Sequence, residues 1–249
     1  MTTACRVLPF AIADGPANMA LDEALLDEVA ADPSHAVLRT YGWSAPTLSL
    51  GYFQEVADAE ADPRWRVAPI VRRPTGGGAI WHHHEITYAM VVPGDHPLAR
   101  HAGDLYRATH AAIAAVLGTQ GLAAVRRGES PASSTRNRPF LCFTDRNPED
   151  IVFDGSKLVG SSQRRRPGAL LQHGSVLLAR SEVIPGVSGV GDLTPVTKDV
   201  HFWSSLLLGS IPAALGFLAE PSAVPGTTRR RAELLEREVY RDPSWTRRR

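Results

Sequence analysis

The stretch from Ile151 to Ser175 constrains the fold more than any other part of this chain. Two short apolar runs, 151–153 and 158–159, are joined through Asp154 and Gly155. This dipeptide readily takes positive φ at both central positions of a type I′ turn, whose twist matches that of two antiparallel strands. The stretch therefore predicts a β-hairpin with its turn at Asp154-Gly155.

Lys157 follows the predicted turn and stands close to apolar residues. Burial lowers the pKa of a lysine and makes its ammonium a strong partner for a carbonyl oxygen, a phosphate or a thiolate. On local sequence alone, a solvated hairpin lysine is the commoner case, because lysine is rarely buried. Lys157 is thus a candidate functional residue whose burial the local pattern leaves open.

A second informative segment, residues 70–93, places three consecutive glycines between two apolar runs. Consecutive glycines let the backbone approach a ligand closely and present N–H groups towards negative charge, although a plain glycine-rich turn has the same composition. Large apolar residues alternate with other residues from Ile86 to Val92. The glycines therefore lead into a strand, and not into the helix of a Walker or dinucleotide-binding motif.

The run His82-His83-His84 raises the question of a metal site. Side chains alternate along a strand, so at most His82 and His84 share a face. No Cys-x-x-Cys or His-Glu-x-x-His pattern accompanies them. We therefore predict no metal site.

The bulk composition narrows the classes of function. A chain of 249 residues with 43% apolar content suits one large domain, and we expect a single catalytic domain over 1–249. The 27 basic and 26 acidic residues give a net charge of +1, which provides no global reason to expect nucleic-acid or membrane binding. The two cysteines, Cys5 and Cys142, lie far apart in sequence, which fits a reducing compartment. No apolar run approaches the roughly 18 residues of a membrane span, so we expect a cytoplasmic protein.

Cys142 lies in an apolar, aromatic segment, residues 140–143, shortly before the hairpin. By its neighbours alone, such a cysteine is most often an inert core residue. Its local sequence leaves open whether it packs or reacts.

Four ordered motifs between residues 14 and 180 resemble the lipoate-protein ligase and octanoyltransferase superfamily, which also includes the biotin protein ligases. The first two are N-M-A-L-D-E-A-L-L, similar to the first helix of the family, and P-T-L-S-L-G-Y-F-Q, similar to a strand end beside the acyl pocket. The third, R-R-P-T-G-G-G-A-I-W-H, resembles the family loop that folds over the acyl chain. The fourth is the hairpin itself, D-G-S-K-L-V-G-S-S-Q-R-R-R, with L-Q-H-G-S after it.

The resemblance implies an α/β (α+β) fold of the biotin/lipoate protein ligase catalytic-domain type, with a central mixed, largely antiparallel β-sheet flanked by helices. It is strongest over 14–180. We expect residues 181–249 to form a helical C-terminal part, with apolar helices near 200–208 and 211–219. We expect this part to be too short for the full accessory domain that ATP-dependent ligases often carry, and that expected absence favours a transferase.

The octanoyltransferase branch has a nucleophilic cysteine before the hairpin, in an A-C-F-like context that L-C-F-T-D matches. The resemblance therefore implies Cys142 as the nucleophile and Lys157 as the cation that favours its thiolate. It also implies a narrow apolar acyl pocket between the loop 73–82, the Lys157 hairpin and the strand at 173–174. The implied substrate-binding residues are Arg73, Thr75, Gly76, Gly77, Gly78, His82, Gly160, Ser161, His173 and Gly174.

The implied reaction moves an octanoyl or lipoyl group from acyl carrier protein to a lysine on another protein, without a cofactor. The implied acceptors are lipoyl domains of 2-oxoacid dehydrogenase subunits and glycine cleavage H protein. An ATP-dependent lipoate-protein ligase that uses ATP and Mg²⁺ is the nearest alternative, because the triple glycine is ligase-like whereas transferases often read T-G-G-R-A. An amidotransferase between carrier proteins and a non-catalytic acyl-binding or carrier-binding module also stay open. The presence of both Cys142 and Lys157 argues against the binding module.

Three consecutive arginines follow the hairpin motif. Arg164, Arg165 and Arg166, with Arg136 and Arg138, form a candidate basic surface for docking an acidic carrier protein or lipoyl domain. A solvated face that binds no partner is an equally good interpretation of these residues.

Overall fold

A computed structural model describes residues 3–66, 68–101, 103–128, 139–145 and 147–249. Within these residues, the main element is a nine-stranded sheet of order β12-β1-β3-β7-β11-β10-β9-β8, with β2 also pairing with β3. Pairs from β3 to β8 are antiparallel, whereas β12, β1 and β2 join in parallel. The predicted mixed, largely antiparallel sheet is confirmed. Its strands are β1 (Ala4–Val7), β2 (Ala11–Ala13), β3 (His35–Trp43), β7 (Glu85–Pro93), β8 (Val125–Arg126), β9 (Ile151–Phe153), β10 (Ser156–Arg166), β11 (Ala169–Leu177) and β12 (Leu218–Pro221).

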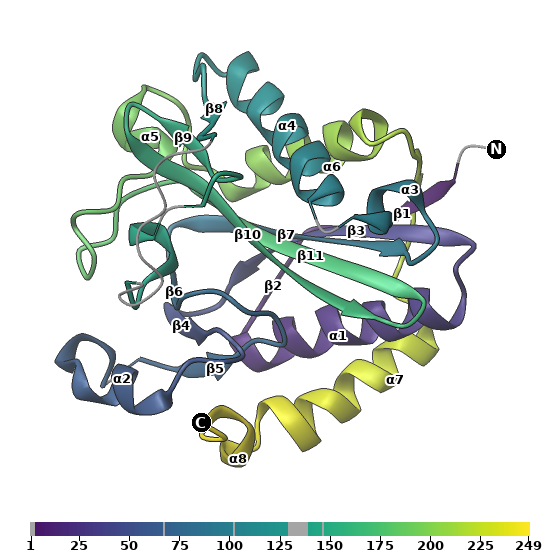
Figure 1. Cartoon of the computed structure of the whole chain (residues 1–249), viewed down its shortest axis with the longest axis horizontal. Coiled ribbons are helices and arrows are strands. Elements are labelled where there is room, and N and C mark those ends of the chain that lie inside the picture. Colours follow the sequence, from purple (N-terminus) through teal and green to yellow (C-terminus); the bar gives the residue numbers. More distant parts are fainter. Residues whose placement is uncertain (1–2, 67, 102, 129–138, 146) are drawn as a thin grey trace.

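Helices cover both faces of this sheet (Figure 1). Helix α1 (Gly15–Ala31) packs on one face with α7 (Gly226–Leu235) against it, and α4 (Asp104–Thr119) and α6 (Val200–Ala214) cover the other. Among the described residues, no helix combines the length and apolar character needed to cross a membrane. The shorter helical segments are α2 (Val56–Ala61), η1 (Pro63–Trp65), α3 (Pro97–Arg100), η2 (Cys142–Thr144), α5 (Val190–Leu193), η3 (Glu236–Tyr240) and α8 (Pro243–Thr246).

Strand β7 shows why the sheet is buried on both sides. Tyr88 and Met90 belong to the apolar core that contains side chains of α4 and α6, whereas Ala89 and Val91 belong to the core that contains those of α1. Because successive side chains of a strand point to opposite faces, one strand contributes to both cores. Every residue of β7 is buried as a result.

The turn between β9 and β10 is the one predicted from sequence. Asp154 and Gly155 have φ of 47° and 72°, the left-handed values that a type I′ turn needs at both central positions. The strands pair antiparallel, with Ser156 opposite Phe153 and Lys157 opposite Val152. The turn therefore sets the register at the start of β10, and a β-bulge between Lys157 and Val159 shifts it further along the strand.

A smaller sheet of order β5-β4-β6 stands beside the large one (Figure 1). Its strands are β4 (Thr47–Leu50), β5 (Ile70–Arg72) and β6 (Ile80–His82). The glycine segment 76–78 connects β5 to β6, so this sheet carries the loop predicted to border the acyl pocket. The following chain continues into β7, which confirms that the glycines lead into strands.

The C-terminal part, residues 181–249, contains helices joined by loops and one strand. Helix α6 is continuous through Pro212 and ends before Gly216, whose φ is 80°. The helix expected near 211–219 is therefore wrong for its second half, where β12 pairs in parallel with β1. Because Pro212 lies in the last turn of α6, its missing N–H interrupts little of that helix.

Gly51 and Gly118 provide a matched test of backbone packing. A Cβ on Gly51 would stand 2.0 Å from the carbonyl oxygen of Gly77, whereas a Cβ on Gly118 would meet no atom within 4 Å. We expect Gly51→Ala to lower the free energy of unfolding by about 1–3 kcal/mol, because the glycine loop must shift. Gly118→Ala, in α4, is expected to raise it by roughly 0.5–1 kcal/mol. Urea unfolding checks both values, and an unchanged Gly51→Ala protein would contradict the close approach.

Candidate active site

Lys157 is held in a largely buried position, with its side chain 9% exposed. Its Nζ donates to the carbonyl oxygen of Cys142 at 2.9 Å, forms an ion pair with Asp150 Oδ2 at 3.0 Å and lies 3.6 Å from Cys142 Sγ. A lysine ammonium has three N–H groups, so these three contacts match its donors in number. The structure thus favours the buried, functional interpretation of Lys157.

Asp150 is a site residue that sequence reasoning missed. It directly precedes β9, is buried and faces Lys157 across the hairpin. Burial raises the pKa of this carboxyl, and the charge of Lys157 opposes that rise. An acidic residue next to the first hairpin strand was the available signal, but its pairing with Lys157 depends on the hairpin register.

Cys142 opens the short helix η2 and is positioned through its backbone. Its N–H donates to the carbonyl oxygen of Ala79 at 2.7 Å, and the Ala79 N–H donates to that of Phe140 at 2.8 Å. A Cβ on Gly78 would stand 3.0 Å from the Cys142 nitrogen. Gly78 therefore allows the loop and the Cys142 segment to pack closely against each other. The sequence had suggested that the glycines allow close approach to a ligand.

Arg73 holds the glycine loop from inside the protein. Its buried guanidinium donates to the carbonyl oxygens of Gly76 and Gly78, both at 2.7 Å, and to that of Ser49 at 3.0 Å. Burial lowers the pKa of Arg73, to about 10, so the side chain stays charged at neutral pH. The positive charge of Arg73 therefore interacts with backbone carbonyl oxygens of the loop.

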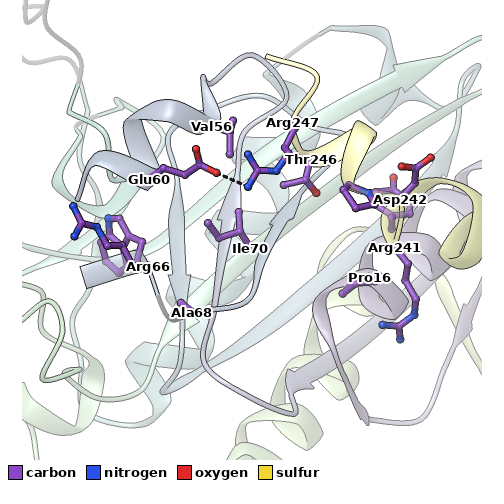
Figure 2. Close-up of a pocket in the computed structure, with 13 residues that line it drawn as sticks. Pro16, Val56, Glu60, Arg66, Ala68, Ile70, Arg241, Asp242, Thr246 and Arg247 are labelled. Carbon is purple, nitrogen blue, oxygen red and sulfur yellow. Dashed lines mark ion pairs between the residues drawn. The ribbon is translucent and has the colours of Figure 1, made fainter. Parts of the chain in front are cut away.

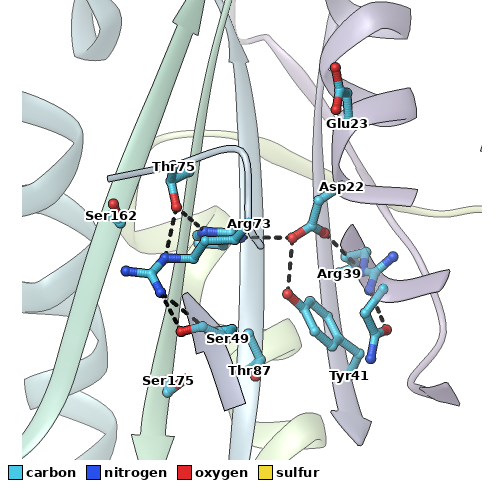
Figure 3. A network of polar contacts seen from close by, with 12 residues as sticks. Asp22, Glu23, Arg39, Tyr41, Ser49, Arg73, Thr75, Thr87, Ser162 and Ser175 are labelled. Atoms are coloured by element: carbon cyan, nitrogen blue, oxygen red, sulfur yellow. Dashed lines mark hydrogen bonds and ion pairs between the residues drawn. The ribbon is translucent and has the colours of Figure 1, made fainter. Parts of the chain in front are cut away.

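A network of buried polar side chains connects this loop to α1 (Figure 3). His173 contacts Asp22 Oδ2 through Nδ1 at 2.8 Å and Thr75 Oγ1 through Nε2 at 2.7 Å. Tyr41 donates to the same Asp22 oxygen at 2.9 Å, and Arg39 lies 3.4 Å from the other oxygen. Both ring nitrogens of His173 are therefore occupied within the protein.

His82 is fixed in the same manner. Its ring contacts Ser49 Oγ at 2.7 Å and Glu85 Oε1 at 2.8 Å, and it stacks on Trp43 with ring centroids 3.7 Å apart. Burial lowers the pKa of His82, although Glu85 opposes this shift. Within the described residues, no group of three or more potential metal-binding side chains occurs.

The predicted pocket segments converge on a narrow cavity with about 390 Å³ of space, part of which is open solvent. The loop 73–82, β10, β11 and Cys142 all contribute to its wall, and Met19, Tyr41, Trp43 and Ile80 supply apolar surface. Of the predicted substrate-binding residues, Arg73, Gly77, His82, Ser161, His173 and Gly174 line it.

The other predicted substrate-binding residues stand behind this wall. Thr75 contacts His173, the Gly76 carbonyl accepts from Ser162 Oγ at 2.8 Å, and Gly78 lies against Cys142. A Cβ on Gly160 would stand 2.8 Å from Lys157 Cε, so this glycine makes room for the lysine chain. Their contacts support the cavity wall and the Lys157 side chain.

Two further hollows have different surroundings. A polar hollow with about 670 Å³ of empty space lies on the far side of Lys157 and includes Arg127, Asp145 and Asp150 in its lining. A wider one, with about 1360 Å³ of space that is partly open solvent, lies between α2 and the C-terminal segment (Figure 2). The ion pair Glu60–Arg247 crosses the wider hollow, and none of the predicted site residues lines it.

Among the described residues of the predicted basic surface, Arg164, Arg165 and Arg166 do not lie together on one face. Arg166 forms ion pairs with Glu23 and Asp27 of α1, whereas Arg165 donates to the carbonyl oxygen of Ala99 at 2.5 Å. Neighbouring side chains on β10 point to opposite faces, so three consecutive arginines cannot share one face. Arg136 and Arg138 lie outside the described residues.

A second missed residue, His110 of α4, lies near the hairpin on the other face of the sheet. Its ring contacts Ser161 Oγ at 2.6 Å and the carbonyl oxygen of Glu149 at 2.5 Å. Burial lowers the pKa of His110 to about 4. A single histidine on the buried side of α4 gives no signal in the sequence of partners that are distant along the chain.

The shifted pKa of His110 predicts a pH-dependent stability. An unfolded histidine binds a proton near pH 6.5, whereas the folded ring does so only near pH 4. As pH falls, the unfolded state is protonated first, so the stability contributed by neutral His110 is complete above about pH 6.5 and is lost towards pH 4. That loss amounts to about 3 kcal/mol. Urea unfolding at stepped pH should show a flatter profile for His110→Gln than for the wild type, and parallel profiles would contradict the assignment.

Comparison with known proteins places the chain in a family. It matches the model of the lipoyl protein ligase A/B catalytic domain over residues 14–182. Octanoyltransferase LipM of Geobacillus kaustophilus is 32% identical over 92% of both chains. Octanoyltransferase LipM of Bacillus subtilis is 38% identical over 66% of this chain and 62% of its own length.

Solved structures agree on the fold. A putative lipoate protein ligase from T. acidophilum superposes with a TM-score of 0.79 over the full length of both chains at 22% identity. A lipoate-protein ligase A bound with ATP gives a TM-score of 0.76 over 99% of both chains at 21% identity. Together with the family match over residues 14–182, these findings show that the chain belongs to the lipoyl protein ligase A/B catalytic domain family.

Proposed function

We propose that the protein is an octanoyltransferase that carries the acyl group as a thioester on Cys142. The observation that carries this proposal is the position of Cys142, whose side chain lines the narrow cavity while its Sγ lies 3.6 Å from the Lys157 ammonium. The curated relatives named octanoyltransferase LipM support the same activity. The donor is octanoyl-acyl carrier protein, and the acceptor is a lysine of a lipoyl domain or of glycine cleavage H protein.

In the first half of the reaction, the Cys142 thiolate attacks the thioester carbonyl carbon of the donor. A new carbon–sulfur bond forms, the bond to the carrier sulfur breaks, and the carrier leaves as a thiolate that takes a proton from water. The Lys157 ammonium, in contact with Sγ, stabilises the thiolate before attack. Because one thioester is exchanged for another, this step needs no ATP.

In the second half, the neutral amine of the acceptor lysine attacks the acyl-enzyme. A carbon–nitrogen bond forms, the carbon–sulfur bond to Cys142 breaks and the Cys142 thiolate leaves beside Lys157, while the nitrogen gives its extra proton to water, which leaves an amide. The carrier sulfur leaves the same carbonyl carbon that the amine later attacks. Both groups therefore need access to that carbon. The polar hollow beside Lys157, which Asp145 and Asp150 also line, offers an approach for both.

The narrow cavity suits a saturated acyl chain. Each buried CH₂ contributes about 0.8 kcal/mol, so a shaped apolar wall supplies most of the affinity of such a chain. The polar side chains His82, His173 and Arg73 hydrogen-bond within the protein. Their polar atoms are therefore already satisfied when an apolar chain enters.

We expect Cys142→Ser to abolish octanoyl transfer, because a serine hydroxyl, unlike a cysteine thiol, does not ionise appreciably at neutral pH. Lys157→Ala is expected to raise the pH midpoint of Cys142 alkylation, since the positive charge beside Sγ is lost. Transfer to a purified lipoyl domain and iodoacetamide kinetics at stepped pH measure these effects.

Cys5→Ser is the matched control. Cys5 is fully buried and burial raises its pKa to about 12, so its removal should change neither transfer nor alkylation. Transfer at the wild-type rate by Cys142→Ser, or activity only with ATP and free lipoate, would support a ligase instead.

A further inference from the structure

A buried polar cluster lies on the sheet face opposite Lys157 and is centred on Ser161. His110 Nε2 and the hydroxyl of Tyr88 both lie 2.6 Å from Ser161 Oγ, and the hydroxyl of Tyr106 donates to the Ser161 carbonyl oxygen at 2.7 Å. Ser161 follows Gly160, which contacts the Lys157 chain, and adjacent residues of a strand face opposite ways. Three side chains from α4 and β7 therefore hold β10 at the point where it supports Lys157.

The directions of these hydrogen bonds are fixed by the acceptors. The Glu149 carbonyl oxygen can only accept, so His110 Nδ1 carries the hydrogen. The ring is neutral at neutral pH because burial lowers the pKa of His110 to about 4. Its Nε2 is then an acceptor, and the Ser161 hydroxyl donates to it. The Tyr88 hydroxyl completes the chain by donating to Ser161 Oγ.

The other contact of His110 reaches the second partner of Lys157. Glu149, whose carbonyl His110 binds, is adjacent to Asp150, whose carboxylate forms the ion pair with Nζ of Lys157. One imidazole thus ties β10 to the segment that carries Asp150. The His110 ring therefore holds both β10, which carries Lys157, and the segment that carries Asp150, its ion-pair partner.

We propose that His110 is a positioning residue for the Cys142–Lys157 pair, acting through Ser161 and through the Glu149 backbone. This inference rests on the proposed function, in which that pair performs the transfer. A neutral, buried ring with both nitrogens engaged is suited to holding geometry and not to taking up a proton. His110 therefore acts on the rate through the direction of the Lys157 ammonium.

Other charged or titratable groups also act on this region. Arg73 and Tyr106 interact electrostatically with Cys142, and Asp145 does so with Asp150. None of these groups is changed in the His110 variants, so a change in Cys142 reactivity reports the coupling itself.

Two substitutions separate the two contacts of the ring. His110→Asn keeps a donor near the Nδ1 position for Glu149, whereas His110→Gln keeps an acceptor near the Nε2 position for Ser161. We expect each to lower kcat for octanoyl transfer by about 10- to 100-fold with little change in KM, because a displacement of about 1 Å has an effect of that size. The pH midpoint of Cys142 alkylation should rise in both variants, by less than in Lys157→Ala.

The decisive control is the Lys157→Ala background. If His110 acts through Lys157, adding either His110 variant to Lys157→Ala leaves the alkylation midpoint where Lys157→Ala alone puts it. Thr109→Val is the matched packing control. Thr109 is the neighbouring buried residue of α4, and its hydroxyl has no hydrogen-bond partner within the described structure, so kcat and the midpoint should stay at wild-type values.

A lowered melting temperature with unchanged kcat and midpoint would overturn the proposal, as would a shift that persists without Lys157. If neither His110 variant folds, Tyr106→Phe decides, because it removes the bond to the Ser161 carbonyl oxygen and is expected to shift the midpoint in the same direction by less. Burial raises the pKa of Tyr106, so its phenol is neutral and the substitution removes no charge near Cys142. Alkylation requires no acyl substrate. Failure of Cys142 as the acyl carrier would therefore appear in the transfer assay and leave the alkylation result interpretable.

Discussion

The contact between the Lys157 ammonium and its three partners is the constraint on which the site depends. Removing an ammonium from water is costly unless its charge is paired and its hydrogens are bonded. Asp150 supplies the charge, the Cys142 carbonyl accepts one hydrogen and Sγ lies at 3.6 Å. A lysine held in this way presents a fixed positive charge to one sulfur, which is what a nucleophilic thiolate requires.

That contact requires three chain segments to meet within a few ångströms. The Asp154-Gly155 turn sets the register of β10, and Gly160 leaves room for the Lys157 chain. Gly78 lets the Cys142 backbone lie against the loop. Small residues at close approaches and buried hydrogen bonds behind them together hold the geometry before a substrate binds.

Local signals predicted the parts of the fold that position the site. The hairpin turn and the strand after the glycines follow from turn chemistry and alternation. The pairing of Cys142 with Lys157 was expected only from the family resemblance, because the local sequence left both residues open. Asp150 and His110 were missed because their partners are set by strand register and helix packing. The three consecutive arginines do not share one surface, although they are adjacent in sequence. Arg166 forms ion pairs with acidic residues of α1 that are distant in sequence.

Intact-mass analysis of the wild-type protein after incubation with octanoyl-acyl carrier protein, in the absence of ATP, tests the central claim most directly. The account predicts a mass increase of one octanoyl group, located on Cys142 by peptide mapping and removed when a lipoyl domain is added. No adduct, an adduct on another residue, or one that the lipoyl domain does not remove would contradict it.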